Sequence, residues 1–141
     1  MLAKNPTRQK IDELQQSMLE LRCDMPDAKH YFMRKCYARE FTLPKGMLVV
    51  GKEHKHEHLI MVTEGHAEIV SEYGRDEVRG GHHFISPAGV KRVVLAFEDT
   101  TFITFHHNPD QIDDCEKIER FIACNDGFLP EYRKAVQGQI K

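Results

Sequence analysis

The sequence predicts a mainly β domain, an antiparallel barrel or sandwich, with a helix at each end. Between residues 30 and 107, short apolar runs alternate with turn residues at intervals of about 8–12 residues, and no helical pattern interrupts them. On both sides of this region, apolar residues recur every three or four positions, which is the period of an amphipathic helix. A chain of 141 residues fits one domain.

The first predicted helix covers residues 6–22. Asn5 is a suitable N-cap, and Pro6 is tolerated in a first turn. One apolar stripe runs along this helix and consists of Ile11, Leu14, Met18 and Leu21. We therefore expect residues 1–28 to form an N-terminal helical extension that packs on the β domain or on a partner chain.

The β domain is expected to cover residues 29–108. Turns are expected where glycine or proline follows an apolar run: 44–46, 64–65, 73–76, 80–81 and 87–89. The strands expected between these turns cover residues 30–42 (one or two strands), 47–50, 58–63, 66–71, 84–85, 90–97 and 101–106.

The helical period returns after Pro109. Asp110 is the expected N-cap, and the apolar stripe consists of Ile112, Cys115, Ile118 and Ile122. We therefore expect residues 109–141 to form a C-terminal helical extension.

Composition excludes several classes of partner. The formal charge is −2, so no basic excess indicates nucleic acid binding. No apolar run approaches the ~20 residues that span a bilayer, and the polar start of the chain lacks the apolar stretch of a signal peptide. The four cysteines form no C-x-x-C pair and are expected to be free thiols. We expect a cytoplasmic protein without a membrane partner.

Histidine is concentrated in one part of the chain. Eight of the nine histidines lie between His54 and His107. Lys52, His54, His56 and His58 have the same parity, so an unbroken strand would place all four on one face. A face with one lysine and three histidines is costly to bury without a ligand, which indicates a binding site.

The glycines and the polar residues between them follow two spaced patterns. The first pattern is Gly46, five residues, Lys52-x-His54, three residues, His58, six residues, Gly65. The second is Gly81, five residues, Pro87-x-Gly89, two residues, Arg92, three residues, Ala96. Both spacings match the two motifs of cupins, so the chain resembles the cupin superfamily. The resemblance implies a single cupin-type, jelly-roll-like antiparallel β-barrel with a ligand site inside it.

A cupin metal is usually held by three histidines and one glutamate, and only His54 keeps the residue expected at its position. In a first interpretation, His54, His58 and His106 hold a divalent ion such as Zn, Fe, Ni or Mn. His106 is included because it has the parity of Phe102 and Thr104, which could line the barrel. Lys52 and Arg92 would then bind a small anionic ligand or stabilise developing negative charge.

A second interpretation needs no metal. Lys52 and Arg92 would bind a phosphate or carboxylate, while a histidine, with His54 as first candidate, acts as acid or base with Lys52 beside it. Metal-free sugar-nucleotide epimerases of the cupin superfamily work in this general way, so the alternative function is a binder or epimerase of sugar phosphates or sugar nucleotides.

A closer resemblance is to small cupin-like proteins of tailed bacteriophages. The stretches 50–58, 85–93 and 98–100 and the helical tail carry it. It implies that Lys52 and Arg92 belong to the site, and it adds a third interpretation, a non-enzymatic structural or accessory protein of the phage particle. The location would then be the host cytoplasm or the virion. Cupins often pair through strands or exchanged N-terminal segments, so a homodimer is expected.

Overall fold

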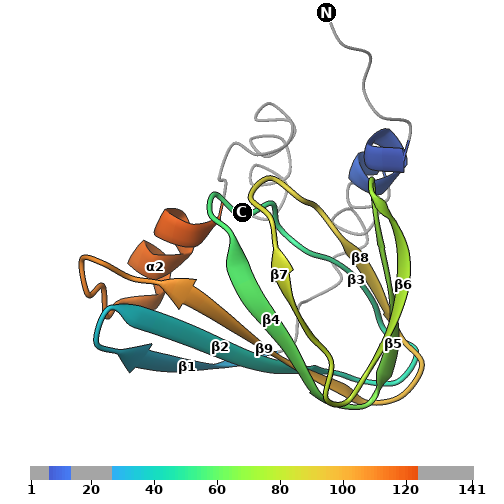
Figure 1. Cartoon of the computed structure of the whole chain (residues 1–141), viewed down its shortest axis with the longest axis horizontal. Coiled ribbons are helices and arrows are strands. Elements are labelled where there is room, and N and C mark those ends of the chain that lie inside the picture. The colour runs from blue at the N-terminus through green and yellow to red at the C-terminus, as the bar shows by residue number, and fades with distance from the viewer. Residues whose placement is uncertain (1–6, 14–26, 124–141) are drawn as a thin grey trace, which may run out of the picture.

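Nine strands in two antiparallel sheets form most of the described protein. The computed structural model describes residues 7–13 and 27–123, and Figure 1 shows the two sheets as facing layers. The first sheet has five strands in the order β1 (Ala28–Met33), β2 (Cys36–Leu43), β9 (Thr100–His107), β4 (His58–Glu64) and β7 (His83–Ser86). The second has four in the order β3 (Leu48–Val50), β8 (Val93–Ala96), β5 (His66–Ser71) and β6 (Gly74–Arg79).

The core lies between the two sheets, because alternate residues of the strands face inward. Phe102 pairs with Phe41 on one side and with Val62 on the other, so these three side chains share the inner face of the five-stranded sheet. The second sheet contributes residues such as Val49, and the buried members of this cluster are Leu43, Val49, Ile60, Val62, Ala67, Ile69, Val78, Ala96 and Phe102. Burying a side chain of this kind contributes about 1.5–3 kcal/mol.

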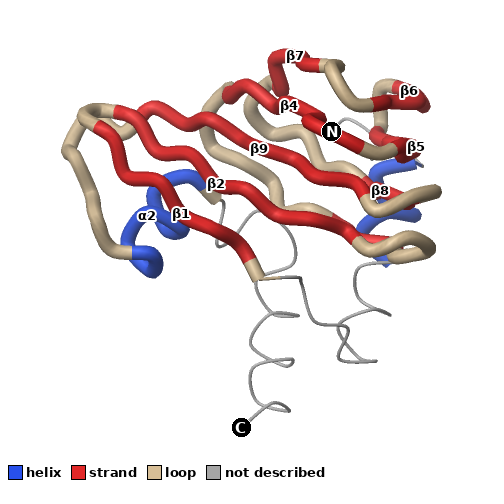
Figure 2. Tube along the Cα trace, turned by 90° about the horizontal axis from the view of Figure 1, so that it is seen from below, coloured by secondary structure: helices blue, strands red, loops and turns tan. Residues whose placement is uncertain are grey.

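Two helices lie at opposite ends of the layered strands, as Figure 2 shows from below. Residues 7–13 are helical, and Ile11 packs with Val50 and Val93 on the face of the four-stranded sheet that points away from the core. Helix α2 (Cys115–Ile122) lies beside β1 and β2, where Ile118 and Ile122 pack with Tyr37. None of the helices in residues 7–13 and 27–123 is long and apolar enough to span a membrane.

The predicted N-cap at Asp110 is wrong, since the N-cap of α2 lies four residues later. The N-cap is Asp114, whose side chain accepts a hydrogen bond of 2.9 Å from the backbone N–H of Lys117. The Asn108 side chain donates to the carbonyl of Ile112 and accepts from its N–H, which holds the preceding residues in a loop. Such local side-chain bonds compete with helix formation. Of the first predicted helix, residues 14–22 lie outside the described residues.

The prediction of a mainly β domain with a helix near each end is confirmed: the strands form two packed sheets. The closure of these sheets into a barrel stays a prediction. Several strand limits differ from those expected. The expected strand over 30–42 is a hairpin of β1 and β2, and the one over 90–97 begins only at Val93. β6 begins at Gly74, inside the predicted turn 73–76.

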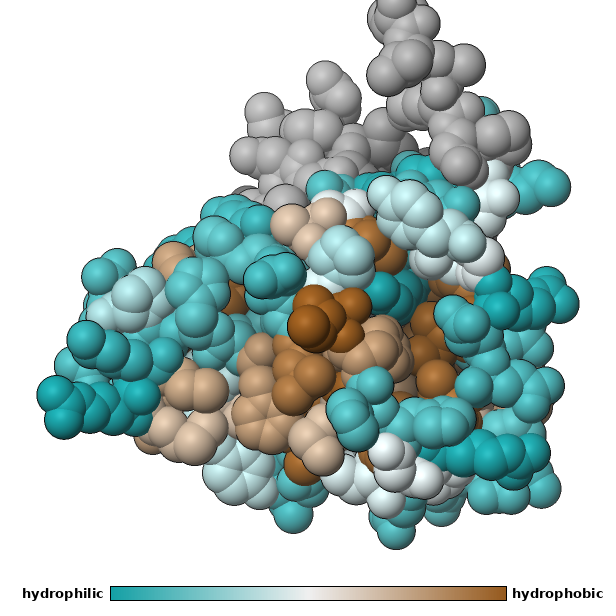
Figure 3. Space-filling model, viewed as in Figure 1, coloured by the Kyte–Doolittle hydropathy of each residue, from teal (hydrophilic) through white to brown (hydrophobic). Residues whose placement is uncertain are grey.

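The outer face of the five-stranded sheet is partly apolar. Figure 3 shows apolar side chains gathered near the centre of the view, over β4 and the edge strand β7. Ile85 of β7 is 66% exposed, and its pairing partner Leu59 is half-buried. The strands of this sheet therefore do not alternate strictly between apolar residues on the core face and polar residues on the solvent face.

Gly65 provides a test of the turn chemistry. It has φ of +101°, and an added Cβ would lie 2.4 Å from the carbonyl oxygen of Asp99. Gly81 has nearly the same φ, +99°, but its Cβ would meet nothing within 4 Å. We expect Gly81→Ala to cost about 1–2 kcal/mol from the left-handed backbone alone, and Gly65→Ala to cost roughly 1–3 kcal/mol more from the clash.

Urea denaturation of both variants measures this difference. Equal losses of unfolding free energy in the two variants would contradict the close approach of Asp99 to Gly65.

Candidate metal centre

Three histidines from different parts of the chain meet at one end of the five-stranded sheet. His58 begins β4 and His106 lies in β9, and the antiparallel register places their side chains side by side on the inner face. His54 comes from the loop between β3 and β4. Its carbonyl accepts a hydrogen bond of 2.9 Å from Gly89 N–H, and its backbone forms a bridge with Ala123 at the end of α2.

The three imidazole rings contact one another. The ring centroids of His54 and His58 are 4.4 Å apart, those of His58 and His106 are 4.6 Å apart, and those of His54 and His106 are 5.4 Å apart. One nitrogen of each ring lies within 4.8 Å of the corresponding nitrogens of the other two. Nitrogens bound to one ion at about 2.1 Å lie about 3–4 Å apart, so this spacing is close to that of a three-histidine metal centre.

All three histidines are held in the neutral form, which is the form that binds a metal. Burial, followed by the neighbouring charge of His58, lowers the pKa of His54 to about 3. Burial, followed by His58 and His54, lowers the pKa of His106 to about 2. Burial also lowers the pKa of His58, and the charges of Arg92 and Arg39 act in the same direction. Each ring therefore presents a lone pair near pH 7.

In His58 and His106 the second ring nitrogen is engaged elsewhere, as in known metal sites. Nδ1 of His58 lies 3.3 Å from the carbonyl oxygen of His56; a carbonyl only accepts, so Nδ1 carries the proton and Nε2 is bare. Nε2 of His106 lies 2.9 Å from the Thr104 hydroxyl and can donate to it, which leaves Nδ1 bare. Nε2 of His54 is buried and has no hydrogen-bond partner among the described residues. The chemistry of this donor set fits a divalent ion.

Arg92 lies beside the histidine cluster on the β7 side. Its Nη1 donates to the hydroxyl of Ser86, the residue that pairs with His58, and its guanidinium carbon lies 5.5 Å from the centre of the Phe84 ring. Burial lowers the pKa of Arg92, while Asp76 and Glu72 raise it. Within residues 7–13 and 27–123, no carboxylate lies within ion-pair distance of this guanidinium, so Arg92 is available to a ligand anion.

Lys52 belongs to the same region but has a protein partner. Its Nζ donates to Oε1 of Glu119 at 2.8 Å, and Nη1 of Arg39 donates to Oε2 of the same carboxylate at 3.0 Å. Although burial works in the opposite direction, Arg39 and Lys52 lower the pKa of Glu119, which is therefore ionised. The Lys52 side chain is 42% exposed. The predicted role of Lys52 in binding an anion thus has to compete with Glu119.

Helix α2 covers the histidines from one side. The carbonyl of Ile122 accepts from the N–H of Lys55 at 2.8 Å, and the carbonyl of Arg120 accepts from the Lys55 ammonium at 2.7 Å. Together with the Glu119 ion pairs, these bonds attach the helix to the loop that carries His54. The predicted C-terminal extension therefore contributes to the site.

Sequence reasoning missed Arg39 and Glu119. Arg39 has the parity of Tyr37 and Phe41, which face inward, so strand parity could have indicated it. Glu119 directly follows Ile118 of the apolar stripe, but only the packing of α2 against Tyr37 brings its carboxylate to Lys52.

The expectation that His56 shares a face with His54 and His58 is wrong, because residues 51–57 do not form a continuous strand. The ring of His56 instead contacts His107 and Phe121, with centroids 4.6 and 5.0 Å away. These contacts lie outside the three-histidine cluster, so His56 is a natural control for it.

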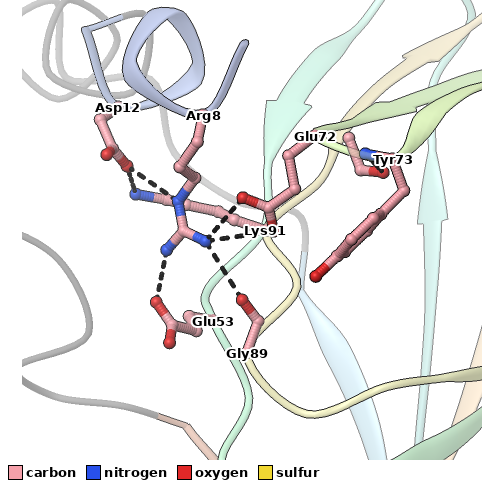
Figure 4. Close-up of polar contacts among 8 residues, drawn as sticks. Arg8, Asp12, Glu53, Glu72, Tyr73, Gly89 and Lys91 are labelled. Atoms are coloured by element: carbon pink, nitrogen blue, oxygen red, sulfur yellow. Dashed lines mark hydrogen bonds and ion pairs between the residues drawn. The ribbon is translucent and has the colours of Figure 1, made fainter. Parts of the chain in front are cut away.

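A second polar network attaches the N-terminal helix to the same loops (Figure 4). Arg8 forms ion pairs with Glu53 and Glu72 and donates to the carbonyl of Gly89 at 3.1 Å. Lys91, which is fully buried, forms an ion pair with Asp12. Because Glu53 precedes His54 and Gly89 bonds to it, this network helps to fix the loop that carries the third histidine.

Neither a protein-family model nor a curated relative matches this sequence. Solved structures do match it. A cupin-2 domain protein from Shewanella frigidimarina has a TM-score of 0.50 and 14% identity over 64% of this chain and 89% of that one. KdgF from Halomonas has a TM-score of 0.51 and 18% identity over 62% and 88%. These TM-scores show that the chain shares the fold of these proteins, the first of which is a cupin-domain protein, while the identities are too low to show more than the fold.

Salicylate 1,2-dioxygenase from Pseudaminobacter salicylatoxidans also matches, with a TM-score of 0.56 and 14% identity over 82% of this chain. The matched part is only 35% of the dioxygenase chain. The cupin fold expected from the two glycine-bounded motifs is thus supported. The predicted association with bacteriophages, the homodimer and the phage-particle role stay predictions.

The lowered histidine pKa values predict an acid-sensitive fold. In the unfolded chain these imidazoles take up protons near pH 6.5, whereas folded His54 and His106 do so only near pH 3 and pH 2. The unfolded state therefore binds more protons below pH 6.5, and stability falls as the pH falls from there towards 3. We expect a contribution of about 1.4 kcal/mol per pH unit from each such histidine.

Urea denaturation of the metal-free protein from pH 7 to pH 4.5 measures this slope. His54→Gln and His106→Gln should each make it shallower, while His83→Gln, at an exposed position, should not. An unchanged slope in both site variants would contradict the burial of neutral imidazoles.

Proposed function

We propose that this protein is a metal-binding cupin that binds, and acts on, a small anionic ligand between its two sheets. His54, His58 and His106 hold a divalent ion such as Zn, Fe, Ni or Mn. The observation that carries the proposal is the convergence of one nitrogen from each of these histidines within 4.8 Å, in rings that are kept neutral. Three imidazoles leave coordination positions open for a ligand.

The anion-binding part of the proposal depends on Arg92. Arg92 is half-buried, its one hydrogen-bond partner in the described residues is the Ser86 hydroxyl, and no carboxylate there lies within ion-pair distance. A carboxylate or phosphate, which offers several acceptor oxygens, is therefore a suitable partner for its guanidinium. Ser86 pairs with His58 across β4 and β7, which supports a position of Arg92 close enough for one ligand to reach both the arginine and the metal centre.

A bound divalent ion would supply Lewis acidity, which polarises a coordinated oxygen of the ligand. Residues of the protein would bind and orient the ligand and exclude water from the site. Arg92 orients the anionic group, and α2 together with the core aromatic residues excludes water. Lys52 and Glu119 form an ion pair at the edge of the site, from which the Lys52 ammonium can stabilise negative charge that develops on the ligand.

Metal binding by purified protein tests the proposal directly. After supplementation with Zn²⁺, Fe²⁺, Ni²⁺ or Mn²⁺ in turn, we expect about one ion per chain. His54→Ala, His58→Ala and His106→Ala should each weaken binding by more than the roughly 10- to 100-fold that loss of an outer supporting group costs. Elemental analysis and calorimetric titration provide the readouts.

His56→Ala is the matched control, since His56 lies two residues from both His54 and His58 but outside the cluster. Retention of stoichiometric metal by all three site variants would reject the metal centre. Ligand binding that survives chelation of every metal would instead support the metal-free binder or epimerase.

A further inference from the structure

Arg39 is a second guanidinium beside the histidines, on the side opposite to Arg92. It pairs with Thr104 across β2 and β9, and Thr104 in turn contacts His106 through its hydroxyl. Arg39 therefore lies on the strand next to β9, which carries His106.

Two buried side-chain atoms in the described part of the chain have no hydrogen-bond partner, and both belong to this region: Nε of Arg39 and Nε2 of His54. An arginine Nε can only donate, and leaving such a donor buried and unpaired costs about 1–3 kcal/mol. Its Nη1 is already engaged by Glu119. Nε of Arg39 therefore has a hydrogen bond still to donate after the Glu119 ion pair is formed.

Arg39 and Arg92 flank the histidines along the sheet. The strand order β2–β9–β4–β7 places Arg39 on the first strand, His106 and His58 on the next two, and Ser86, which contacts Arg92, on the last. Three inter-strand intervals of about 4.8 Å separate the outer two strands.

The positive charges of the site exceed the carboxylates that pair with them. Arg39 and Lys52 share the single carboxylate of Glu119, and Arg92 forms no ion pair within the described ranges. Arg39 and Arg92 are half-buried, and a nearby anion favours a cation that is partly removed from water. The two guanidinium groups lie on different sides of the histidines. Negative charge that compensates them therefore has to be present at two separate positions, one beside each arginine.

We propose that the ligand carries two separated anionic groups, one bound by Arg39 and the other by Arg92, so that it spans the three histidines. A small linear dicarboxylate, or a molecule with a carboxylate at one end and a phosphate at the other, has this chemistry. The inference rests on the proposed function, to which it adds the class of ligand and Arg39 as a residue that determines specificity.

Binding of matched acids tests the inference. Linear dicarboxylates from succinate to suberate, and the monocarboxylates with the same numbers of carbons, are titrated calorimetrically into the full-length metal-loaded protein. We expect at least one dicarboxylate to bind roughly 10- to 100-fold more tightly than its matched monocarboxylate, which is the usual effect of one additional charged hydrogen-bond pair.

Arg39→Gln and Arg92→Gln should each reduce the affinity for that dicarboxylate to about the level of the monocarboxylate. Arg79→Gln, at an exposed position of β6, is the control and should leave the affinity unchanged. If Arg39→Gln does not fold, Arg92→Gln decides alone. The inference is overturned if no dicarboxylate is preferred, or if the folded arginine variants keep the preference.

The two proposals fail separately. Metal content is measured on the same protein before each titration. A chain that binds one metal ion but shows no preference for dicarboxylates rejects only the two-anion ligand. A chain that prefers a dicarboxylate equally well after chelation keeps the two arginines as its ligand site and rejects the metal centre.

Discussion

The pairing of β4 with β9 is the constraint on which the site depends. This register sets His58 beside His106 on the inner face, and the same two strands carry the core pair of Val62 and Phe102 farther along. A slip of β4 by one residue against β9 would turn His58 to the outer face, away from His106, and Val62 with it, away from Phe102. The apolar core therefore fixes the positions of the metal-binding side chains on these two strands. The same strand pairing thus determines both the geometry of the site and the stability of the fold.

The position of His54 is fixed by loop contacts and not by strand pairing. It lies in a loop, and loops hold side chains less firmly than strands do. Here the loop is fixed from both sides: Gly89 and the Arg8 network hold it against the four-stranded sheet, and Lys55 and Ala123 attach it to α2. Both helical extensions thus support one face of the site, although their sequences indicate only amphipathic packing.

Strand parity and motif spacing predict much of this arrangement. The parity of His106 with Phe102 and Thr104 places it on the inner face, as the structure shows, and the turn glycines at 46, 65, 81 and 89 all have positive φ. Parity failed at His56, because it applies only to an unbroken strand. The ion pairs of Glu119 could not be predicted, since they depend on how α2 packs against Tyr37, which no local pattern encodes.

The central claim concerns the position of one ion, and anomalous X-ray scattering from crystals grown with Zn²⁺ and measured at the zinc absorption edge tests it most directly. We expect one strong peak between the imidazole rings of His54, His58 and His106, about 2.1 Å from a nitrogen of each. A structure with no peak there in zinc-saturated protein, or with these rings turned away from one another, would contradict it.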